Sequence, residues 1–375
     1  MENKFLNRKY IIWIDIVILC IIVFFLAKMG INALVLKNEI KNSEHGITIS
    51  KNVHMYSSPK EKKKYDSIEI GSDAYILKST TDKENTDWYK VKIGDKVGYV
   101  KAKEISKYKK TYQKRDLMLD VSKFNMQNNF KSIGEFKAFV LNNNIKFVYI
   151  RAGGRGYGQA GNFYTDPYAD DYANACDFLG IPFGYYFLEE AITSEEVDEE
   201  IEFINQYLRE HSYKNNVLPI AIDVEKHVEA GRADSIWNTR YQLVNELIDK
   251  FEDNNKKVIL YSNANIADEF LENVNTQMWL AYYPSLSSIP NYWYSDTDGD
   301  GALNKNIITK MVGWQFTQNG ITDVINEKVD ISLVYSNYLL NNDMQDVEND
   351  IKETNEMVFG PINKARKNLL DNWYT

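Results

Sequence analysis

Three hydrophobic patterns follow one another along the chain. Residues 10–27 are almost continuously apolar, with a single carboxylate inside the run and three basic residues before it. Residues 46–106 show short runs in which apolar and polar positions alternate, separated by Ser-Pro, Gly-Ser and Gly-Asp pairs that favour turns. From residue 116 onward, apolar runs of strand length alternate with helical patterns. The patterns predict, in this order, a membrane-spanning helix, a small β domain and an α/β domain.

The first apolar run is long enough to cross a bilayer once as a helix, at about 1.5 Å per residue. Lys4, Arg8 and Lys9 precede it, and basic residues stay mostly on the cytoplasmic side of a membrane. We therefore expect a single-pass protein of the cell membrane, with a cytoplasmic tail at residues 1–9 and an uncleaved transmembrane anchor at residues 10–29. All later residues are then extracytoplasmic. A cleaved signal peptide is the alternative, although its apolar core is usually shorter.

The segments that follow the anchor differ in composition. Residues 30–45 are expected to form a linker, residues 46–106 a small all-β barrel, and residues 107–115 a connector rich in Lys and Tyr. The alternation within the barrel accounts for about five strands.

The small β domain resembles the bacterial SH3-like domain. The matching residues are Val53 followed by Ser58-Pro59, then Trp88-Tyr89-Lys90-Val91 and Gly98-Tyr99-Val100, whereas Tyr56-Ser57-Ser58 replaces the usual Arg-Ser-Gly before the proline. The resemblance implies binding to cell-wall peptide. A spacer whose aromatic residues only fill its own core is the alternative.

The α/β domain is predicted to span residues 116–340. Helical patterns follow each of its first five strands, whereas the last three strands lack comparable helices. This alternation favours a parallel sheet, and eight strands favour a closed, irregular TIM-like (β/α)5β3 barrel, with an open doubly wound sheet as the alternative. The strands are expected at residues 117–121, 146–151, 182–187, 218–224, 257–262, 278–283, 311–316 and 328–334. The helices are expected around residues 133–140, 168–179, 197–208, 236–251 and 264–272, with Thr193 and Glu196 as a capping box before the third. A helical C-terminal extension is expected at residues 341–375.

Charge divides the chain into two parts. Residues 1–114 carry 22 Lys and Arg against 13 Asp and Glu, whereas residues 115–375 carry 22 against 40. The acidic part would repel the phosphates of nucleic acid, so we expect no nucleic-acid partner. The basic part suits an anionic surface such as a membrane or a bacterial cell wall.

The sequence predicts no cofactor. Cys20 and Cys176 lie in different predicted segments, so no intrachain disulfide is expected. The four histidines form no zinc motif, and residues 153–158, which are rich in glycine, lack the spacing of a nucleotide-binding loop and are interpreted as a flexible strand-end loop. Residues 296–304 imitate the start of a calcium loop, but Ile307 stands where the bidentate Glu is expected. An ordinary turn is therefore favoured there, and no metal is predicted.

Four acids mark the predicted strand ends. Asp120 ends the first strand, Asp223 and Glu225 end the fourth, and Asp330 lies in the eighth. Barrels of this kind carry their chemistry at the carboxyl ends of the strands. Residues at positions i and i+2 of a strand point to the same side, about 6.6 Å apart, and the first and last strands of a closed barrel are neighbours. We therefore expect all four acids around one cavity. Strand-end acids that only cap helices or pair with bases are the alternative.

Clustered carboxylates raise one another's pKa. A protonated acid beside ionised ones is what cleavage of a glycosidic bond requires, so glycoside hydrolysis is the expected reaction class.

Residues 116–335 resemble the glycoside hydrolase family 25 muramidases, the lysozymes of Chalaropsis type, whose fold is a barrel with eight strands and five helices. The matching elements are Leu119-Asp120-Val121-Ser122, Phe147-Val148-Tyr149-Ile150-Arg151-Ala152, Ile181-Pro182-Phe183-Gly184-Tyr185-Tyr186-Phe187, Leu218-Pro219-Ile220-Ala221-Ile222-Asp223-Val224-Glu225, Trp279-Leu280-Ala281-Tyr282-Tyr283, Trp314-Gln315-Phe316-Thr317 and Val329-Asp330. The chain departs from the family at Asn125, where Gln is frequent, and at Ser332, where Asn is frequent.

The resemblance implies a role for each acid. Glu225 looks like the general acid, and Asp223 looks like the group that either stabilises the positive charge on the sugar or orients the acetamido group of the substrate. Asp120 and Asp330 match the remaining acids, which tune protonation and fix the sugar. Arg151 is expected to pair with a carboxylate or to grip the substrate. The residues that match cleft positions, each with a purely structural role as the alternative, are Tyr186, Trp279, Tyr283 and Trp314.

The sequence therefore predicts a membrane-anchored peptidoglycan hydrolase that faces outward and cleaves between N-acetylmuramic acid and N-acetylglucosamine during local wall remodelling. Its expected partners are peptidoglycan glycan strands, cell-wall peptide through the SH3-like domain, and the membrane through residues 10–29. Two alternatives stay open: an enzyme on another N-acetylated glycan such as chitin, and a catalytically silent scaffold that binds the wall.

Overall fold

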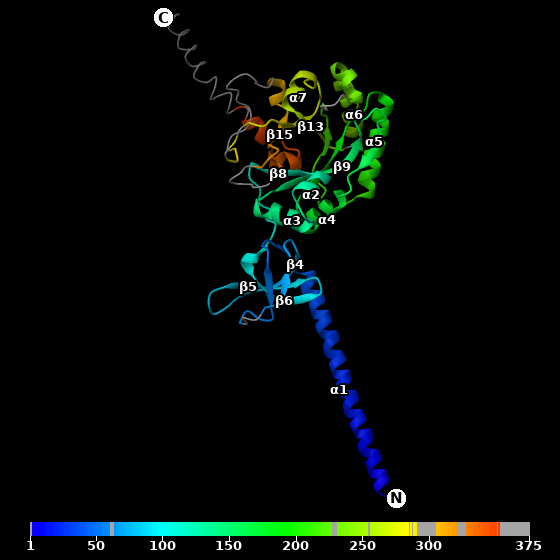
Figure 1. Ribbon diagram of the computed structural model, residues 1–375, viewed down its shortest axis with the longest axis vertical. Helices are drawn as coiled ribbons and strands as arrows, with labels where there is room; N and C mark the ends of the chain where they lie inside the picture. Colours follow the sequence, from blue (N-terminus) through cyan, green and yellow to red (C-terminus); the bar gives the residue numbers. More distant parts are fainter. Residues whose placement is uncertain are drawn as a thin grey trace, which may run out of the picture. The chain divides into compact units, whose positions relative to one another are not determined.

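The computed structural model describes residues 2–60, 64–226, 231–253, 256–284, 286, 288–290, 305–320, 328–350 and 352. The chain divides into two compact units between Lys107 and Tyr108 (Figure 1).

The N-terminal unit begins with α1 (Glu2–Lys41), a single helix of 40 residues. Residues 17–41 contain a window with mean hydropathy 2.4, none of which is buried against the rest of the protein. The length and composition of this helix suit a membrane span, and they also suit a signal sequence. The helix continues through residues 30–41, most of the segment expected to be a linker, because these residues include no proline and only one glycine, Gly30.

A seven-stranded antiparallel sheet follows α1 in the same unit, in the order β3-β2-β6-β5-β4-β1-β7. The alternating positions of the strands supply one core, which includes Val53, Ile76 and Val91. Two short strands, β2 and β7, add to the five that alternation predicted. The strands and their one 3-10 turn are β1 (Glu44–Thr48), β2 (Val53–Tyr56), β3 (Lys64–Ile68), β4 (Asp73–Thr81), β5 (Asp87–Ile93), β6 (Lys96–Lys101), η1 (Ala102–Glu104) and β7 (Ile105–Ser106).

The C-terminal unit is built on a closed barrel of eight strands, as predicted. Neighbouring strands pair in the order β9-β11-β12-β13-β14-β15-β16-β8, and β8 pairs in turn with β9. All pairs are parallel except those of β16, which runs antiparallel to both β15 and β8. The barrel strands are β8 (Arg115–Val121), β9 (Phe147–Arg155), β11 (Phe183–Leu188), β12 (Ile220–Asp223), β13 (Val258–Asn263), β14 (Gln277–Ala281), β15 (Met311–Thr317) and β16 (Asp330–Tyr335).

Helices follow the first five barrel strands, which agrees with the (β/α)5β3 prediction. The helices are α2 (Lys123–Asn128) and α3 (Ile133–Asn142) after β8, α4 (Ala169–Leu179) after β9, α5 (Ser194–Glu210) after β11, η2 (Arg232–Ile236) and α6 (Trp237–Glu252) after β12, and α7 (Ala264–Phe270) after β13. Two short helices come later, α8 (Lys305–Ile308) and α9 (Ser336–Asn341). Thr193 caps α5 as expected, by accepting from the Glu196 backbone N–H, but the Glu196 carboxylate accepts from Ile192 N–H instead of closing the capping box.

The glycine-rich segment at residues 153–158, predicted as a loop, lies outside the strands only from Gly156 onward. Gly153 and Gly154 lie inside β9, which continues to Arg155 and pairs with a short extra strand, β10 (Phe163–Thr165). Both glycines have positive φ, and a Cβ at Gly153 would stand 2.0 Å from the carbonyl oxygen of Tyr164. Glycine is therefore required here because neighbouring backbones approach too closely for any side chain.

Candidate active site

The four acids come from three strands and meet at one end of the barrel. Asp120 lies near the end of β8 and is the direct cross-strand partner of Asp330, the first residue of β16. Asp223 is the last residue of β12, and Glu225 follows two residues later. Each of the three aspartates experiences the charge of Glu225. The structure thus brings together all four acids that the sequence singled out.

Burial and mutual repulsion raise the pKa values of three of these acids. Asp120 and Asp223 are each only 7% exposed, and burial, followed by the charges of Asp330 on Asp120 and of Glu225 on Asp223, raises both pKa values. Burial and the charge of Glu225 also raise the pKa of Asp330 to about 7. The four groups therefore cannot all be ionised at neutral pH, and the site retains at least one proton for donation.

Arg151, on β9, is the cation that opposes this effect at Asp223. Its guanidinium lowers the pKa of Asp223 against the larger effects of burial and of Glu225. Its Nε donates to Asp166 over 3.1 Å, and its guanidinium carbon lies 5.0 Å from the centre of the Phe124 ring. Arg151 is thus held beside the acids by a buried ion pair, so its orientation is fixed before any ligand binds.

Gln315, on β15, connects the acids to two tyrosines and was not identified as a site residue from sequence. Its Nε2 donates to Asp120 over 2.8 Å, while its Oε1 accepts from the hydroxyls of Tyr261 at 2.9 Å and Tyr283 at 2.6 Å. Two phenol donors on Oε1 leave only the amine side of the amide for Asp120. The one feature of the sequence that could have identified Gln315 is its position as a large polar residue inside an otherwise apolar strand.

The aromatic residues proposed for the cleft divide into two groups. Tyr186 is partly exposed and experiences the charges of Asp120, Asp223 and Asp330, and Tyr283 is 40% exposed. Trp279 and Trp314, by contrast, are 2% and 0% exposed. These two tryptophans belong to the core, so the prediction that they contact sugar was wrong.

Both departures from the family pattern make structural contacts near the acids. Asn125 completes a capping box at the start of α2, whose N-cap Ser122 is two residues after Asp120, by accepting from Ser122 N–H over 2.8 Å. Ser332 accepts from the indole Nε1 of Trp279 over 2.9 Å in the barrel interior. Each residue therefore fixes backbone or core close to an acid.

A buried ion-pair network lies beside the acids and was not predicted either. Arg240 of α6 is fully buried and donates to the Glu189 carboxylate over 2.7 Å, and it lies 3.6 Å from Glu190. Glu190 adds to the charge that raises the pKa of Asp223. The end of β11 is thus tied to a helix by charges taken out of water, and removing one partner of such a pair is strongly destabilising.

Among the described residues, no group of three or more His, Cys, Asp and Glu is arranged to hold a metal ion. The segment at residues 296–304, which imitates a calcium loop, lies outside the described residues.

Comparison with known proteins identifies one family. A model of the glycosyl hydrolases family 25 matches residues 119–325, which include Asp120, Asp223 and Glu225 and end just before Asp330. No curated protein matches the chain.

Solved structures also match the chain at low sequence identity. The spore cortex lytic enzyme SleM of Clostridium perfringens is 20% identical, with 60% of this chain and 69% of that chain covered and a TM-score of 0.44. The modular autolysin LytC of Streptococcus pneumoniae is 18% identical, with 77% and 58% covered and a TM-score of 0.43, so this chain spans little more than half of LytC. A family 25 glycosyl hydrolase of Bacillus anthracis is 20% identical, with 62% and 94% covered and a TM-score of 0.42.

Proposed function

Because the chain belongs to the glycosyl hydrolases family 25, we propose that this glycoside hydrolase is a muramidase, which cleaves the β-1,4 bond between N-acetylmuramic acid and N-acetylglucosamine in peptidoglycan. The observation that carries the proposal is the meeting of Asp120, Asp223, Glu225 and Asp330 at one end of the barrel. Such a site holds a proton and negative charge side by side, as glycosidic cleavage needs.

Glu225 is the proposed general acid. It is only partly buried, whereas Asp223 and Asp120 are buried, so Glu225 has the better access to the bridging oxygen of a bound glycan. It donates its proton to that oxygen as the bond to the sugar carbon breaks, and a water molecule then supplies the hydroxyl that replaces the leaving sugar. Asp223 either stabilises the positive charge on the sugar or orients the acetamido group of the substrate as nucleophile.

Asp120 and Asp330 are proposed to set the protonation state of this pair. Both lie close enough to Glu225 for its charge to raise their pKa values. Tyr186 and Tyr283, which are partly exposed beside the acids, are proposed to contact the sugar, and Arg151 is proposed to hold the orientation of Asp223 or of the substrate.

Helix α1 is proposed to anchor the enzyme in the cell membrane with its N-terminus in the cytoplasm. Large apolar side chains along it, such as Leu19 at 61% and Phe24 at 65%, are exposed, and basic residues precede the apolar run. An anchored enzyme would act on nearby wall, which suits local remodelling. Fractionation of cells tests this: wild-type protein found soluble outside the cell would contradict the anchor.

The β unit is proposed to bind cell-wall peptide as an SH3-like domain. A cavity of about 510 Å³ is lined by aromatic and charged residues of both signs, including Tyr56, Lys60, Asp82 and Trp88. Mixed charges beside aromatic faces suit a short peptide that carries amines and carboxylates. Loss of binding to purified walls in the Tyr56→Ala variant, with the wild-type melting temperature retained, is the expected result.

The decisive experiment compares the full-length wild type, purified in detergent, with Glu225→Gln and with a matched control, Glu202→Gln, an exposed residue of α5. Each is incubated with purified peptidoglycan and with chitin, and released fragments are reduced and identified by mass spectrometry. The wild type and the control should release muropeptides with reduced muramic acid ends, and Glu225→Gln should bind the wall without releasing them. Glucosamine ends or cleavage of chitin would contradict the specificity, and no release by the wild type would favour a wall-binding scaffold.

A further inference from the structure

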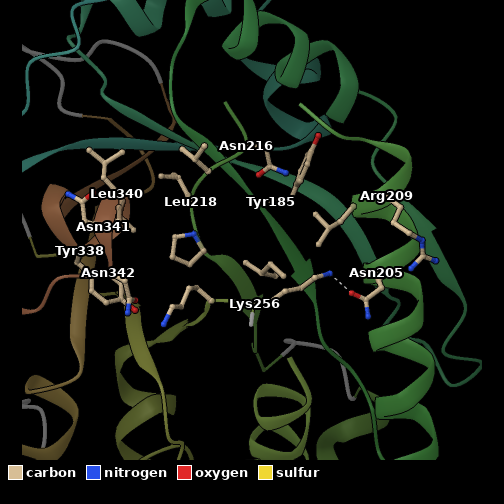
Figure 2. Close-up of a pocket in the computed structure, with 16 residues that line it drawn as sticks. Tyr185, Asn205, Arg209, Asn216, Leu218, Lys256, Tyr338, Leu340, Asn341 and Asn342 are labelled. Atoms are coloured by element: carbon tan, nitrogen blue, oxygen red, sulfur yellow. Dashed lines mark hydrogen bonds between the residues drawn. The ribbon is translucent and has the colours of Figure 1, made fainter. Parts of the chain in front are cut away.

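The C-terminal unit also contains a cavity at the end of the barrel opposite the four acids. Figure 2 shows the residues that line it. It has a volume of about 740 Å³, and its lining includes Leu218 and Pro219, which precede β12, Lys256 and Lys257, which precede β13, and the segment around Asn341, which ends α9 after β16. Asp223 is the last residue of β12, at the opposite end of that strand from Leu218 and Pro219. This basal cavity, as we name it, is therefore distinct from the acid site, and its size is that of a typical ligand pocket.

The basal cavity is cationic in an acidic domain. Arg209, Lys256 and Lys257 line it, and its lining includes no carboxylate. Residues 115–375 carry 40 Asp and Glu against 22 Lys and Arg, so a random patch of this size would hold more acids than bases. Within the part of the chain that the structure describes, none of the three cations has a carboxylate within 4.0 Å. No described carboxylate therefore pairs directly with the cations of the cavity.

Two of the cations, Arg209 and Lys256, repel one another. The Lys256 ammonium donates to the amide oxygen of Asn205 and not to a carboxylate. Burial lowers the pKa of Lys256, and the charge of Arg209 lowers it further. An anion between these two groups would remove the repulsion and gain a charge-assisted hydrogen bond from each.

Neutral polar and apolar groups surround the cations. Figure 2 shows Asn205 and Arg209 on one helix at one side of the cavity, Asn341 and Asn342 at the other side, and Lys256 between them. Side-chain amides can donate to and accept from hydroxyl groups. The cavity therefore offers charges for an anion and amides for a hydroxylated neighbour.

We propose that the basal cavity binds the phosphate groups of a phosphodiester-linked polyol, an anionic polymer of the cell wall. Arginine presents a planar fork that matches phosphate, and lysine adds a point charge. That the polymer comes from the cell wall rests on the proposed function. That the cavity recognises a polyol phosphate does not.

The test uses the full-length chain in detergent and a fluorescently labelled glycerol phosphate hexamer, with binding followed by anisotropy at 150 mM salt, a concentration at which weak surface attraction is screened. The cavity variant replaces Arg209, Lys256 and Lys257 with Gln. The control variant replaces three exposed lysines outside the cavity, Lys109, Lys110 and Lys131, with Gln and so has the same net charge. Arg209→Gln alone serves if the triple variant does not fold.

We expect the cavity variant to bind the hexamer at least tenfold more weakly than the wild type, and the control variant to stay within twofold. Equal losses in both variants, or no binding by the wild type, would overturn the proposal. A labelled glutamate hexamer that binds as tightly would overturn the assignment to phosphate. Muropeptide release from peptidoglycan stripped of anionic polymers should be the same in the wild type and the cavity variant, so failure of the proposed hydrolysis is distinguished from failure of this binding.

Discussion

Replacing Asp330 with Asn should stabilise the protein at alkaline pH while it damages the site. Asp330 has an ordinary pKa of 3.8, which burial and the charge of Glu225 raise to about 7 in the folded state. Between these two values the folded chain holds a proton that the unfolded chain has lost. The contribution of this group to the free energy of unfolding is therefore fully present below about pH 4 and is lost as the pH rises through about 7.

The magnitude follows from the size of the pKa change. About three pKa units correspond to roughly 4 kcal/mol, which we reduce to about 2 kcal/mol because the side chain is partly exposed and shares its interactions with other acids. Asn cannot ionise, so Asp330→Asn should exceed the wild type by only about 0.5 kcal/mol at pH 4.5 and by about 2 kcal/mol at pH 8. For a domain of this size that difference is a melting-temperature gain of about 5 °C.

The assay is thermal unfolding of the full-length protein followed by near-ultraviolet circular dichroism at pH 4.5 and pH 8. Asp171→Asn, an exposed acid on α4, is the matched control and should leave the pH dependence unchanged. If Asp330→Asn and the wild type lose the same melting temperature between the two pH values, Asp330 is not the proton-holding group inferred here. Hydrolysis by Asp330→Asn should fall at both pH values, which separates the gain in stability from the loss of function.

Three further variants test other parts of the structure. Gln315→Leu removes the donor that lowers the pKa of Asp120, so the pH–rate profile should move to higher pH and kcat should fall about tenfold; a profile that superimposes on the wild type would contradict the role of Gln315. Gly153→Ala should cost at least about 2 kcal/mol in urea unfolding because its φ is +152° and a Cβ has no room, whereas Gly158→Ala, with open space around it, should change little. Trp279→Phe should lower stability by about 2–4 kcal/mol through a lost buried hydrogen bond and a small cavity without raising KM, and a raised KM would restore a role in sugar binding.

Much of the barrel is predictable because its signals are local. Period-two and period-3.6 patterns, with Gly180 ending α4 in the left-handed conformation, define the eight strands and five main helices. The acids are predictable for the same reason, since a polar residue at the end of an apolar strand stands out. Gly153 and Gly154 were misread because their requirement arises from β10 and β11, which the pattern of β9 does not reveal.

The two tryptophans were misassigned because the alternation of a strand predicts which face of the sheet a side chain occupies. It does not predict whether that side chain is buried or reaches the surface. Trp279 is the third residue of the five in β14, and Trp314 is the fourth of the seven in β15, and both are buried. Trp314 stands next to Gln315 in β15, so it faces the opposite side of the sheet from the acid site. Tyr283 lies beyond the end of β14 and reaches the surface. Gln315 and Arg240 were missed because their partners come from distant segments, and a single sequence contains no signal for such pairs.

The antiparallel direction of β16 explains how Asp330 joins the site. In the structure Asp330 is the first residue of its strand, whereas Asp120 and Asp223 lie at or near the ends of theirs. In a fully parallel barrel a residue at the start of a strand lies at the end opposite the catalytic mouth. Because β16 runs antiparallel to β8, its first residue pairs directly with Asp120. The reversal of this one strand therefore adds a fourth carboxyl to a site that seven parallel strands alone would leave with three.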